Sequence, residues 1–414
     1  MFAEPKSGAS VPPPGWRRAG KEVLRTLAYA TVALAPVEGY LTDIQGHLGK
    51  VAPSLLIVAW LATLFRERRA PRWTLLHAVL ALLAVVVATS AAVHSPGTFT
   101  AAYTLRWLPF LVLAAVLADV AGHEMSIRGL LVAMSVGAVL AGVGALCGLL
   151  LDGHSRASGP QPDPNDLAYF LVAAIPPLFI VRRETWKWRG AVFAAGGVLV
   201  TAALATFSRG GALGLLVAAA WLSLRRVLPW RVFAGAAMAV VVLCSGALLF
   251  AGPQLTRAIQ EKSFIAASNV DTRELRWEAA ARMVAADPVL GVGPGGFREA
   301  YAAASHNAEI DEQTPVAHNM YFEVAAELGL PGLTLFIAMI GVAFTTSERT
   351  VRSATPAART EAVVIQASLV AVLVMSMFLS EQYYLPLWSL VALAVATGFR
   401  EHSEGKSCRC VSCT

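Results

Sequence analysis

The chain has few charged residues for its length. Of its 414 residues, 14% are charged, 8% are aromatic and 56% are hydrophobic. Because a soluble domain usually carries about 25% charged residues, this chain lacks the charge needed to cover a surface that faces water. The shortage excludes a soluble globular domain and predicts that the apolar excess faces lipid.

Cysteines and metal-binding motifs are also scarce. Cys147 and Cys244 lie in apolar runs, so we expect them to be small core residues. Cys408, Cys410 and Cys413 crowd the C-terminal segment, but a metal site normally needs four ligands at workable spacing. A solvated tail is therefore favoured over a metal site there. The sequence has no HExxH motif and no Asp-x-Asp pair that stands out, so neither a metal mechanism nor a cofactor is predicted.

Long apolar runs dominate what is present. Each is near the length that spans the hydrocarbon of a bilayer. They predict an all-α polytopic membrane protein with about twelve transmembrane helices. The runs cover residues 26–41, 51–65, 74–93, 105–121, 128–151, 166–181, 190–206, 210–224, 231–252, 319–345, 361–380 and 385–399.

The basic residues orient these spans. If the N-terminus is cytoplasmic, the inside segments hold about 23 of the 33 Lys and Arg, which is a strong positive-inside bias. The net charge of +6 then reflects topology, and no nucleic-acid partner is predicted. The predicted organisation is a disordered cytoplasmic arm that is not a cleaved signal peptide (1–25), spans one to nine (26–252), a periplasmic loop (253–317), spans ten to twelve (318–400) and a cytoplasmic tail (401–414).

The loop over 253–317 is far longer than an ordinary connection, which indicates a function and some structure of its own. Residues Thr272–Ala286 read as an amphipathic helix, with Asp271 as a candidate cap. The segment DPVLGVGPGGF follows, and its glycines and prolines predict a turn that ends the helix.

Polar residues gather in segments that this topology places on the outer face. Each segment also has an ordinary structural interpretation: a loop with Asn165 or Asp166 as a helix cap, an arginine reaching lipid headgroups, a solvated helix face, or a structural histidine at a helix start. The convergence of Arg156, Arg209, Arg273 and His318 on one side favours a site. The segments are Arg156–Asp166, Phe207–Gly211, Asp271–Trp277 and Ala317–Gly332.

Arginines beside a histidine suit a particular substrate class. Guanidinium groups bind phosphate through two parallel hydrogen bonds and stay charged, and imidazole accepts a proton near neutral pH. A lipid diphosphate that carries a sugar would place its phosphates at the membrane interface and its sugar in water. Arginines would then stabilise the diphosphate as it leaves.

At these residues the sequence resembles the O-antigen ligase-like family of bacterial glycan ligases and polymerases. The resemblance covers roughly residues 150 to 345, with the motifs in the family's order. The matching features are Arg156 with Pro164-Asn165, Ser208-Arg209-Gly210, Arg273-x-x-x-Trp277, Asp287-Pro288 with Gly291-x-Gly293-x-Gly295-x-Phe297, and His318-Asn319-x-Tyr321 with Glu327-x-Gly329-x-x-Gly332.

The resemblance implies an inverting, metal-independent glycosyltransferase of GT-C-like fold in the bacterial inner membrane, acting at the periplasmic face. Its donor would be a glycan on undecaprenyl diphosphate and its acceptor a lipid A-core or another glycan, with membrane lipid around it. It implies that Arg209 and Arg273 engage the diphosphate and that His318 is the base or positions the acceptor. Further substrate-binding positions would be Arg156, Asn165, Arg276 (also the alternative to Arg273), Asn319 and Tyr321.

Two other classes of function stay open at this point. A transporter or flippase for a lipid-linked anion would place broken helices and charges near the bilayer midplane. A non-catalytic membrane protein with a binding loop would need no histidine beside arginines from separate segments. The polar residues gather at one face, which favours the transferase over both.

Overall fold

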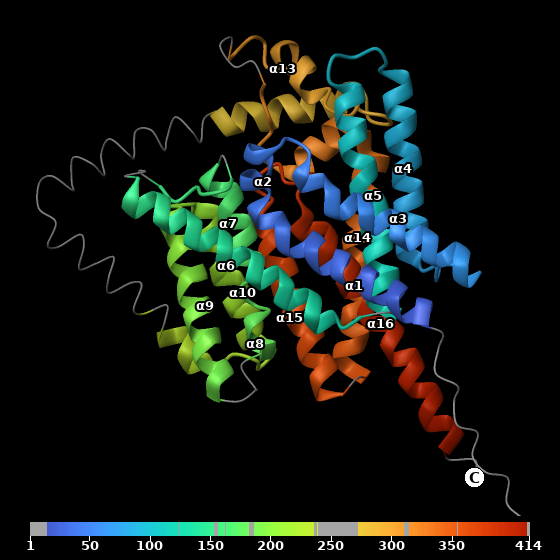
Figure 1. Cartoon of the computed structure of the whole chain (residues 1–414). Coiled ribbons are helices and arrows are strands. Elements are labelled where there is room, and N and C mark those ends of the chain that lie inside the picture. The colour runs from blue at the N-terminus through green and yellow to red at the C-terminus, as the bar shows by residue number, and fades with distance from the viewer. Residues whose placement is uncertain are drawn as a thin grey trace, which may run out of the picture.

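The structure is a computed structural model that describes residues 15–123, 125–152, 156–161, 163–181, 186–235, 238, 272–309, 314–353 and 355–411. Within these ranges every regular element is a helix. This confirms the predicted all-α fold class. The helices form a bundle, and the helices of the long loop cover one end of it (Figure 1).

The helices of the described chain include one that lies in the long loop and spans residues 272–286. The other elements are α1 (Gly15–Leu34), the 3-10 turn η1 (Ala35–Val37), α2 (Glu38–Ile44), α3 (Leu48–Glu67), α4 (Leu75–Val93), α5 (Thr100–His123), α6 (Ile127–Leu151), α7 (Pro164–Ala173), α8 (Leu178–Val181), α9 (Trp186–Ala205), α10 (Arg209–Leu224), α13 (Phe297–Ala304), α14 (Met320–Ser353), α15 (Pro356–Met375) and α16 (Leu385–Val411).

Eight helical segments of the described chain are long and apolar enough to cross a membrane. They are α3, α4, α5, α6, α7 together with α8, α9, α14 and α15. The helix α10 and residues Leu385–Phe399 of α16 are apolar but shorter. These segments support a multi-pass membrane fold. The count of about twelve spans stays a prediction, because most of the predicted ninth span lies in residues 239–271, outside the described residues.

The first predicted span differs from the structure. The helix α1 begins at Gly15 and ends at Leu34, so residues 15–25 of the predicted disordered arm are helical. The apolar run then continues through η1 and α2 instead of one straight helix. Pro36 explains the break, because proline lacks a backbone N–H and its ring clashes with the preceding helical turn.

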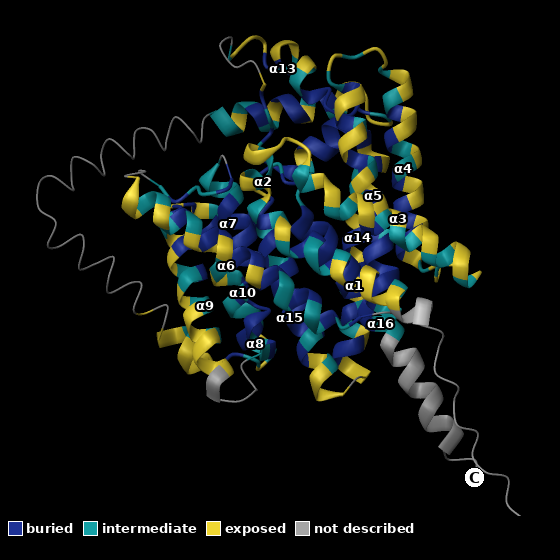
Figure 2. Ribbon diagram, in the orientation of Figure 1, coloured by how far each residue is buried: buried dark blue, intermediate teal, exposed yellow. Residues whose placement is uncertain are grey.

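Buried residues concentrate where α14, α15 and α16 meet α4, α5 and α10 (Figure 2). The indole of Trp107 lies edge-on to Phe336 at 6.2 Å and to Trp388 at 6.0 Å between ring centres. These fully buried rings join α5, α14 and α16. Cys147 was expected in the core but is exposed on α6, on the same stripe as Leu140, Val143 and Leu150. That stripe follows helical periodicity and is apolar, as a lipid-facing surface requires.

The helix α14 is broken where the loop docks on it. Gly329 has φ 68° and ψ −174°, and Pro331 follows it. The break frees carbonyl groups of the preceding turn, and backbone N–H groups of the loop donate hydrogen bonds to them. The backbone N–H of Val292 donates to Ala326 O at 2.8 Å, and that of Gly293 to Glu327 O at 3.0 Å.

The predicted loop helix and turn are both present. Residues 272–286 form the helix, and turns occupy 288–292 and 294–296 before α13. The N–H of Leu330, released by the break in α14, donates to Pro288 O at 2.8 Å. The glycine-rich turn and the Glu-x-Gly segment of α14 thus pair with each other through their backbones.

Candidate functional site

The start of α10 carries the first predicted site residue. Ser208 caps the helix, and its Oγ accepts a hydrogen bond from the Gly211 backbone N–H at 3.1 Å. Arg209 occupies the first helical position and is exposed. Backbone N–H groups and the helix dipole make such a helix start favourable for an anion.

Arg156 lies against the turn that precedes α10. Its Nε donates to the Thr206 carbonyl at 2.7 Å, and its Nη2 lies 3.4 Å from Asn165 Oδ1. The Ala157 N–H also donates to the carbonyl of Ala205 at 3.0 Å. Arg156 and Asn165 therefore meet in space, and Arg156 supports the turn that precedes Arg209. A direct role for either in binding substrate stays a prediction.

The cap of α7 differs from the expectation. Asp163 caps this helix, not Asn165 or Asp166, and its Oδ1 accepts the Asn165 backbone N–H at 2.8 Å. Pro164 occupies the first helical turn, where its fixed φ suits the helix and its missing N–H has no consequence. Asp166 lies in the first turn of α7, and its Oδ2 accepts the Tyr384 hydroxyl at 2.6 Å.

The loop helix 272–286 presents two arginines with different surroundings. Arg276 is buried and forms a bidentate ion pair with Glu309, in which both N–O distances are 3.0 Å. Its Nη1 also donates to Val316 O at 3.3 Å. Arg273, one turn earlier, is half-buried and has no carboxylate partner among the described residues. Arg273 is thus better placed than Arg276 to bind an anionic substrate.

Glu309 completes the surroundings of Arg276. It also accepts a hydrogen bond from the Tyr301 hydroxyl. Burial raises the pKa of Glu309, but the bonds from Arg276 and Tyr301 hold it below its ordinary value. Burial and the bond to Glu309 raise the pKa of Tyr301 to about 12. The group is a charged anchor inside the loop.

His318 lies in the turn just before α14. Its backbone has φ 48°, a left-handed conformation that is uncommon outside glycine. Asn319 caps α14, because its Oδ1 accepts the N–H groups of Tyr321 at 3.0 Å and Phe322 at 3.2 Å. The Tyr321 hydroxyl donates to Leu373 O in α15 at 2.9 Å. Asn319 and Tyr321 are therefore engaged in holding the start of α14.

Electrostatic coupling shows which predicted residues the fold brings together. Burial and the positive charge of Arg209 lower the pKa of Arg273, while Asp163 raises it. Burial and then the charges of Arg276 and Arg273 lower the pKa of His318 below its ordinary value of 6.5. His318 is therefore neutral at pH 7 and able to accept a proton.

Sequence reasoning missed several carboxylates around this cluster. Asp163 acts on both Arg273 and His318, and Glu323 acts on His318. Burial and the neighbouring Asp166 raise the pKa of Glu381 well above its ordinary value. Asp163 had a readable signal, because an aspartate directly before a proline at a helix start is typical of an N-cap.

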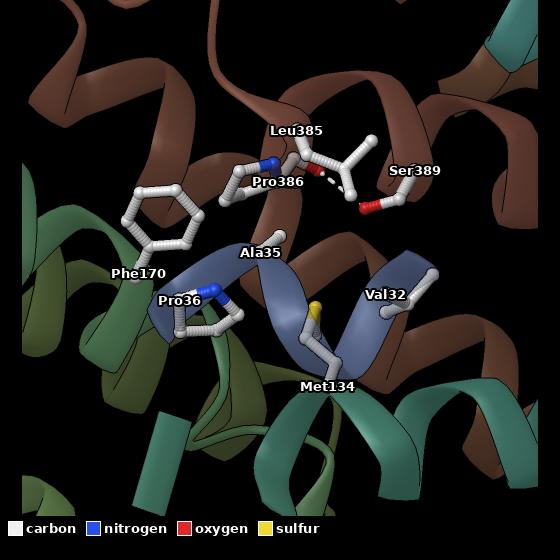
Figure 3. Close-up of a pocket in the computed structure, with 8 residues that line it drawn as sticks. All are labelled: Val32, Ala35, Pro36, Met134, Phe170, Leu385, Pro386 and Ser389. Carbon is white, nitrogen blue, oxygen red and sulfur yellow. Dashed lines mark hydrogen bonds between the residues drawn. The ribbon is translucent and has the colours of Figure 1, made fainter. Parts of the chain in front are cut away.

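A small apolar pocket lies apart from these residues, between α1 with η1, α6, α7 and α16 (Figure 3). None of the predicted site residues lines it. The single hydroxyl there, that of Ser389, already donates to Pro386 O at 3.1 Å. The pocket therefore offers shape and apolar surface but no group for catalysis. Its lining residues are Val32, Ala35, Pro36, Met134, Phe170, Leu385, Pro386 and Ser389.

Comparison with known proteins agrees with the motifs. No curated protein matches the chain. A family model described as O-Antigen ligase matches residues 194–337, a range that holds Arg209, Arg273 and His318. The match supports an O-antigen ligase- or polymerase-type membrane glycosyltransferase in general terms. Over this range the chain is similar to the O-antigen ligase family, in agreement with the resemblance that its motifs carry.

Proposed function

We propose that this protein transfers a glycan from undecaprenyl diphosphate to an acceptor hydroxyl, with inversion at the anomeric carbon and without a metal ion. The observation that carries the proposal is the convergence of Arg209, Arg273 and His318 from three separate segments. Arg209 and Arg273 each act on the next member of this set through charge. The family match covers all three positions.

The arginines would bind the diphosphate of the donor. Two guanidinium groups held near each other repel, and burial together with the charge of Arg209 lowers the pKa of Arg273. A diphosphate between them would remove the repulsion and accept bidentate hydrogen bonds from both. The first N–H groups of α10 would add to the stabilisation as negative charge develops on the leaving diphosphate.

His318 would act on the acceptor. As the acceptor oxygen attacks the anomeric carbon, the bond to the diphosphate oxygen breaks and the neutral imidazole takes the hydroxyl proton. Burial and then the charges of Arg276 and Arg273 lower the pKa of the imidazole, which favours the neutral form that a base requires. Asn319 would fix the position of this histidine by capping α14.

The proposed orientation places this end of the bundle in the periplasm of a bacterial inner membrane. The support is the excess of Lys and Arg in the segments of the opposite end. Reporter fusions after Ile259 and after Ser353 should then report opposite compartments. The same signal from both fusions would reverse or refute this arrangement.

Turnover by the purified protein tests the activity. The full chain in lipid vesicles should release undecaprenyl diphosphate from a glycan-loaded donor only when an acceptor is present. A ligase would use a lipid A-core acceptor, whereas a polymerase would use a second lipid-linked repeat unit. Movement of the donor across the bilayer without release of the diphosphate would instead identify a flippase, and binding without turnover would identify a non-catalytic protein.

A further inference from the structure

Four hydrogen-bond donors converge on one buried carboxylate next to the candidate site. Glu323 lies in the first turn of α14 and is fully buried. Its Oε1 accepts from Gln382 Nε2 at 2.9 Å and from Arg298 Nη1 at 3.3 Å. Its Oε2 accepts from the Ala317 backbone N–H at 3.1 Å and from the Ser380 hydroxyl. A carboxylate can accept all four bonds, whereas an amide would point its own donor at one of them.

One of these contacts reaches the turn that carries His318. The Ala317 N–H is held by Glu323, and the Ala317 carbonyl accepts from Trp277 Nε1 at 3.0 Å. Both polar groups of the residue before His318 are thus fixed from opposite sides, and Asn319 is fixed by its cap. A left-handed backbone at a residue other than glycine persists where the surrounding structure over-determines it.

We infer that Glu323 and Trp277 are positioning residues that hold the Ala317–His318 turn, so that the imidazole lies beside Arg273. This inference rests on the proposed role of His318. Trp277 belongs to the same helix as Arg273, so one rigid element sets both the anion-binding arginine and the histidine turn. Glu323 ties the same turn to α14 through its bond from the Ala317 N–H.

Arg298 ties the same carboxylate to the loop. Its Nη1 lies 3.3 Å from Glu323 and 3.4 Å from Glu327, and its guanidinium carbon lies 4.2 Å from the ring centre of Tyr103. Burial lowers the pKa of Arg298, but the charges of Glu323 and Glu327 raise it above its ordinary value. The arginine therefore stays charged and fixes Glu323 in place.

Glu327 provides a matched control for Glu323. It lies one turn later on α14, is equally buried, and shares Arg298 as a partner. Its other oxygen lies 3.3 Å from the Tyr383 hydroxyl. Among the described contacts of Glu327, none reaches residues 314–319. Loss of Glu327 should therefore weaken loop docking without releasing His318.

Steady-state kinetics on the full chain in vesicles compares Glu323→Gln with Glu327→Gln, using a glycan-loaded undecaprenyl diphosphate donor. Glu323→Gln should lower kcat by roughly 10- to 100-fold, since a misplacement of about 1 Å has effects of that order. The donor KM should change by less than about threefold, because the arginines are intact. Glu327→Gln should keep kcat within about threefold of the wild type.

Trp277→Phe tests the other contact to this turn, the bond from Trp277 to the Ala317 carbonyl. The phenyl ring keeps an aromatic group against Phe322, whose ring centre lies 5.9 Å from that of Trp277, while the N–H that donates to Ala317 is lost together with one ring of the indole. This variant should fold even if Glu323→Gln does not, and its kcat should fall severalfold at unchanged donor KM. An unchanged kcat in Trp277→Phe would overturn the inference.

Hydrogen exchange of the peptide covering 314–319, measured without substrate, gives a readout independent of activity. The amide of Ala317 should exchange faster in Glu323→Gln than in the wild type and in Glu327→Gln. Unchanged exchange in Glu323→Gln, or an equal loss of kcat in both glutamate variants, would refute a positioning role. If the wild type transfers no glycan, the proposed function fails, but the exchange result still decides whether Glu323 holds the turn.

Discussion

The two groups of arginines at the loop end of the bundle differ in their partners. Arg276 and Arg298 are buried in ion pairs with Glu309 and with two glutamates of α14. Arg209 and Arg273 are more exposed and face no carboxylate partner among the described residues. The first group is neutralised and holds the loop, whereas the second keeps its charge for an external anion. The difference separates structural from ligand-binding arginines where residue type alone does not.

The largest effect on turnover is expected at His318, which lies beside Arg273, one of the two unpaired arginines. His318→Ala should lower turnover by about 10² to 10⁴-fold, the range typical of general-base catalysis, with donor binding preserved. Turnover of the wild type should fall on acidification as the imidazole becomes protonated. Because the pKa of His318 is lowered, this fall should occur below pH 6.5, the ordinary histidine value.

Replacement of His306 is the control, since this residue is an exposed loop histidine outside the cluster. His306→Ala should leave turnover and the pH profile unchanged. If His318→Gln keeps most of the turnover and the acidic fall disappears, the histidine orients the acceptor instead of accepting its proton. The proton would then pass to water or to a phosphate oxygen of the donor.

Replacement of the two unpaired arginines should give the next largest loss of turnover. Arg209→Lys and Arg273→Lys should each lower turnover by about 10² to 10³-fold, as for loss of one donor to a developing anion. Lysine keeps the charge but loses the bidentate geometry. The measurement is diphosphate release at saturating acceptor. Near wild-type turnover in both variants would remove them from the mechanism.

Arg282→Lys is the matched control for Arg273→Lys. Arg282 lies on the same loop helix and pairs with Glu278 at 2.8 Å in an exposed position. Its replacement should leave turnover unchanged. An equal loss in Arg282→Lys would show that any arginine of this helix matters, which would contradict the distinction between paired and unpaired arginines.

Replacement of a paired arginine should lower the stability of the protein. Arg298→Met leaves Glu323 and Glu327 buried without their cation, and breaking such a buried pair typically destabilises by about 3–5 kcal/mol. Thermal unfolding in detergent should show a clear drop in Tm. Arg282→Met, which removes an exposed pair, should change stability by about 1 kcal/mol or less. Equal Tm values for the two variants would refute the docking role of Arg298.

The smallest effect is expected at the backbone contact between loop and helix. Gly329→Ala places a Cβ 2.6 Å from the Val289 carbonyl carbon, at a φ and ψ that only glycine adopts readily. Such strain should destabilise by about 1–3 kcal/mol. Gly341, in the same helix, has no atom within 4 Å of an added Cβ, so Gly341→Ala should be neutral or slightly stabilising. A Gly329→Ala protein with wild-type Tm would show that the loop tolerates a shift there.

The sequence predicted features that depend on local pattern. The apolar runs gave the helical membrane fold, and the amphipathic pattern gave the loop helix at 272–286. The order of motifs indicated the family that the comparison supports. The helix starts were less accurate, because the α7 cap is Asp163 and α1 begins well before its apolar run. Capping depends on which side chain reaches a free N–H, and periodicity does not contain that information.

Charge alone determined that this chain belongs in a membrane, because too few polar residues exist to cover it in water. Only the tertiary structure decided which arginines are neutralised. Arg273 and Arg276 lie three residues apart, yet only Arg276 of the two pairs with Glu309, which is 33 residues away along the chain. The role of Glu323 was equally hidden, since its donors come from α13, from the turn before α14 and from the segment between α15 and α16. Such pairings depend on distances across the fold, and spacing along the chain does not fix them.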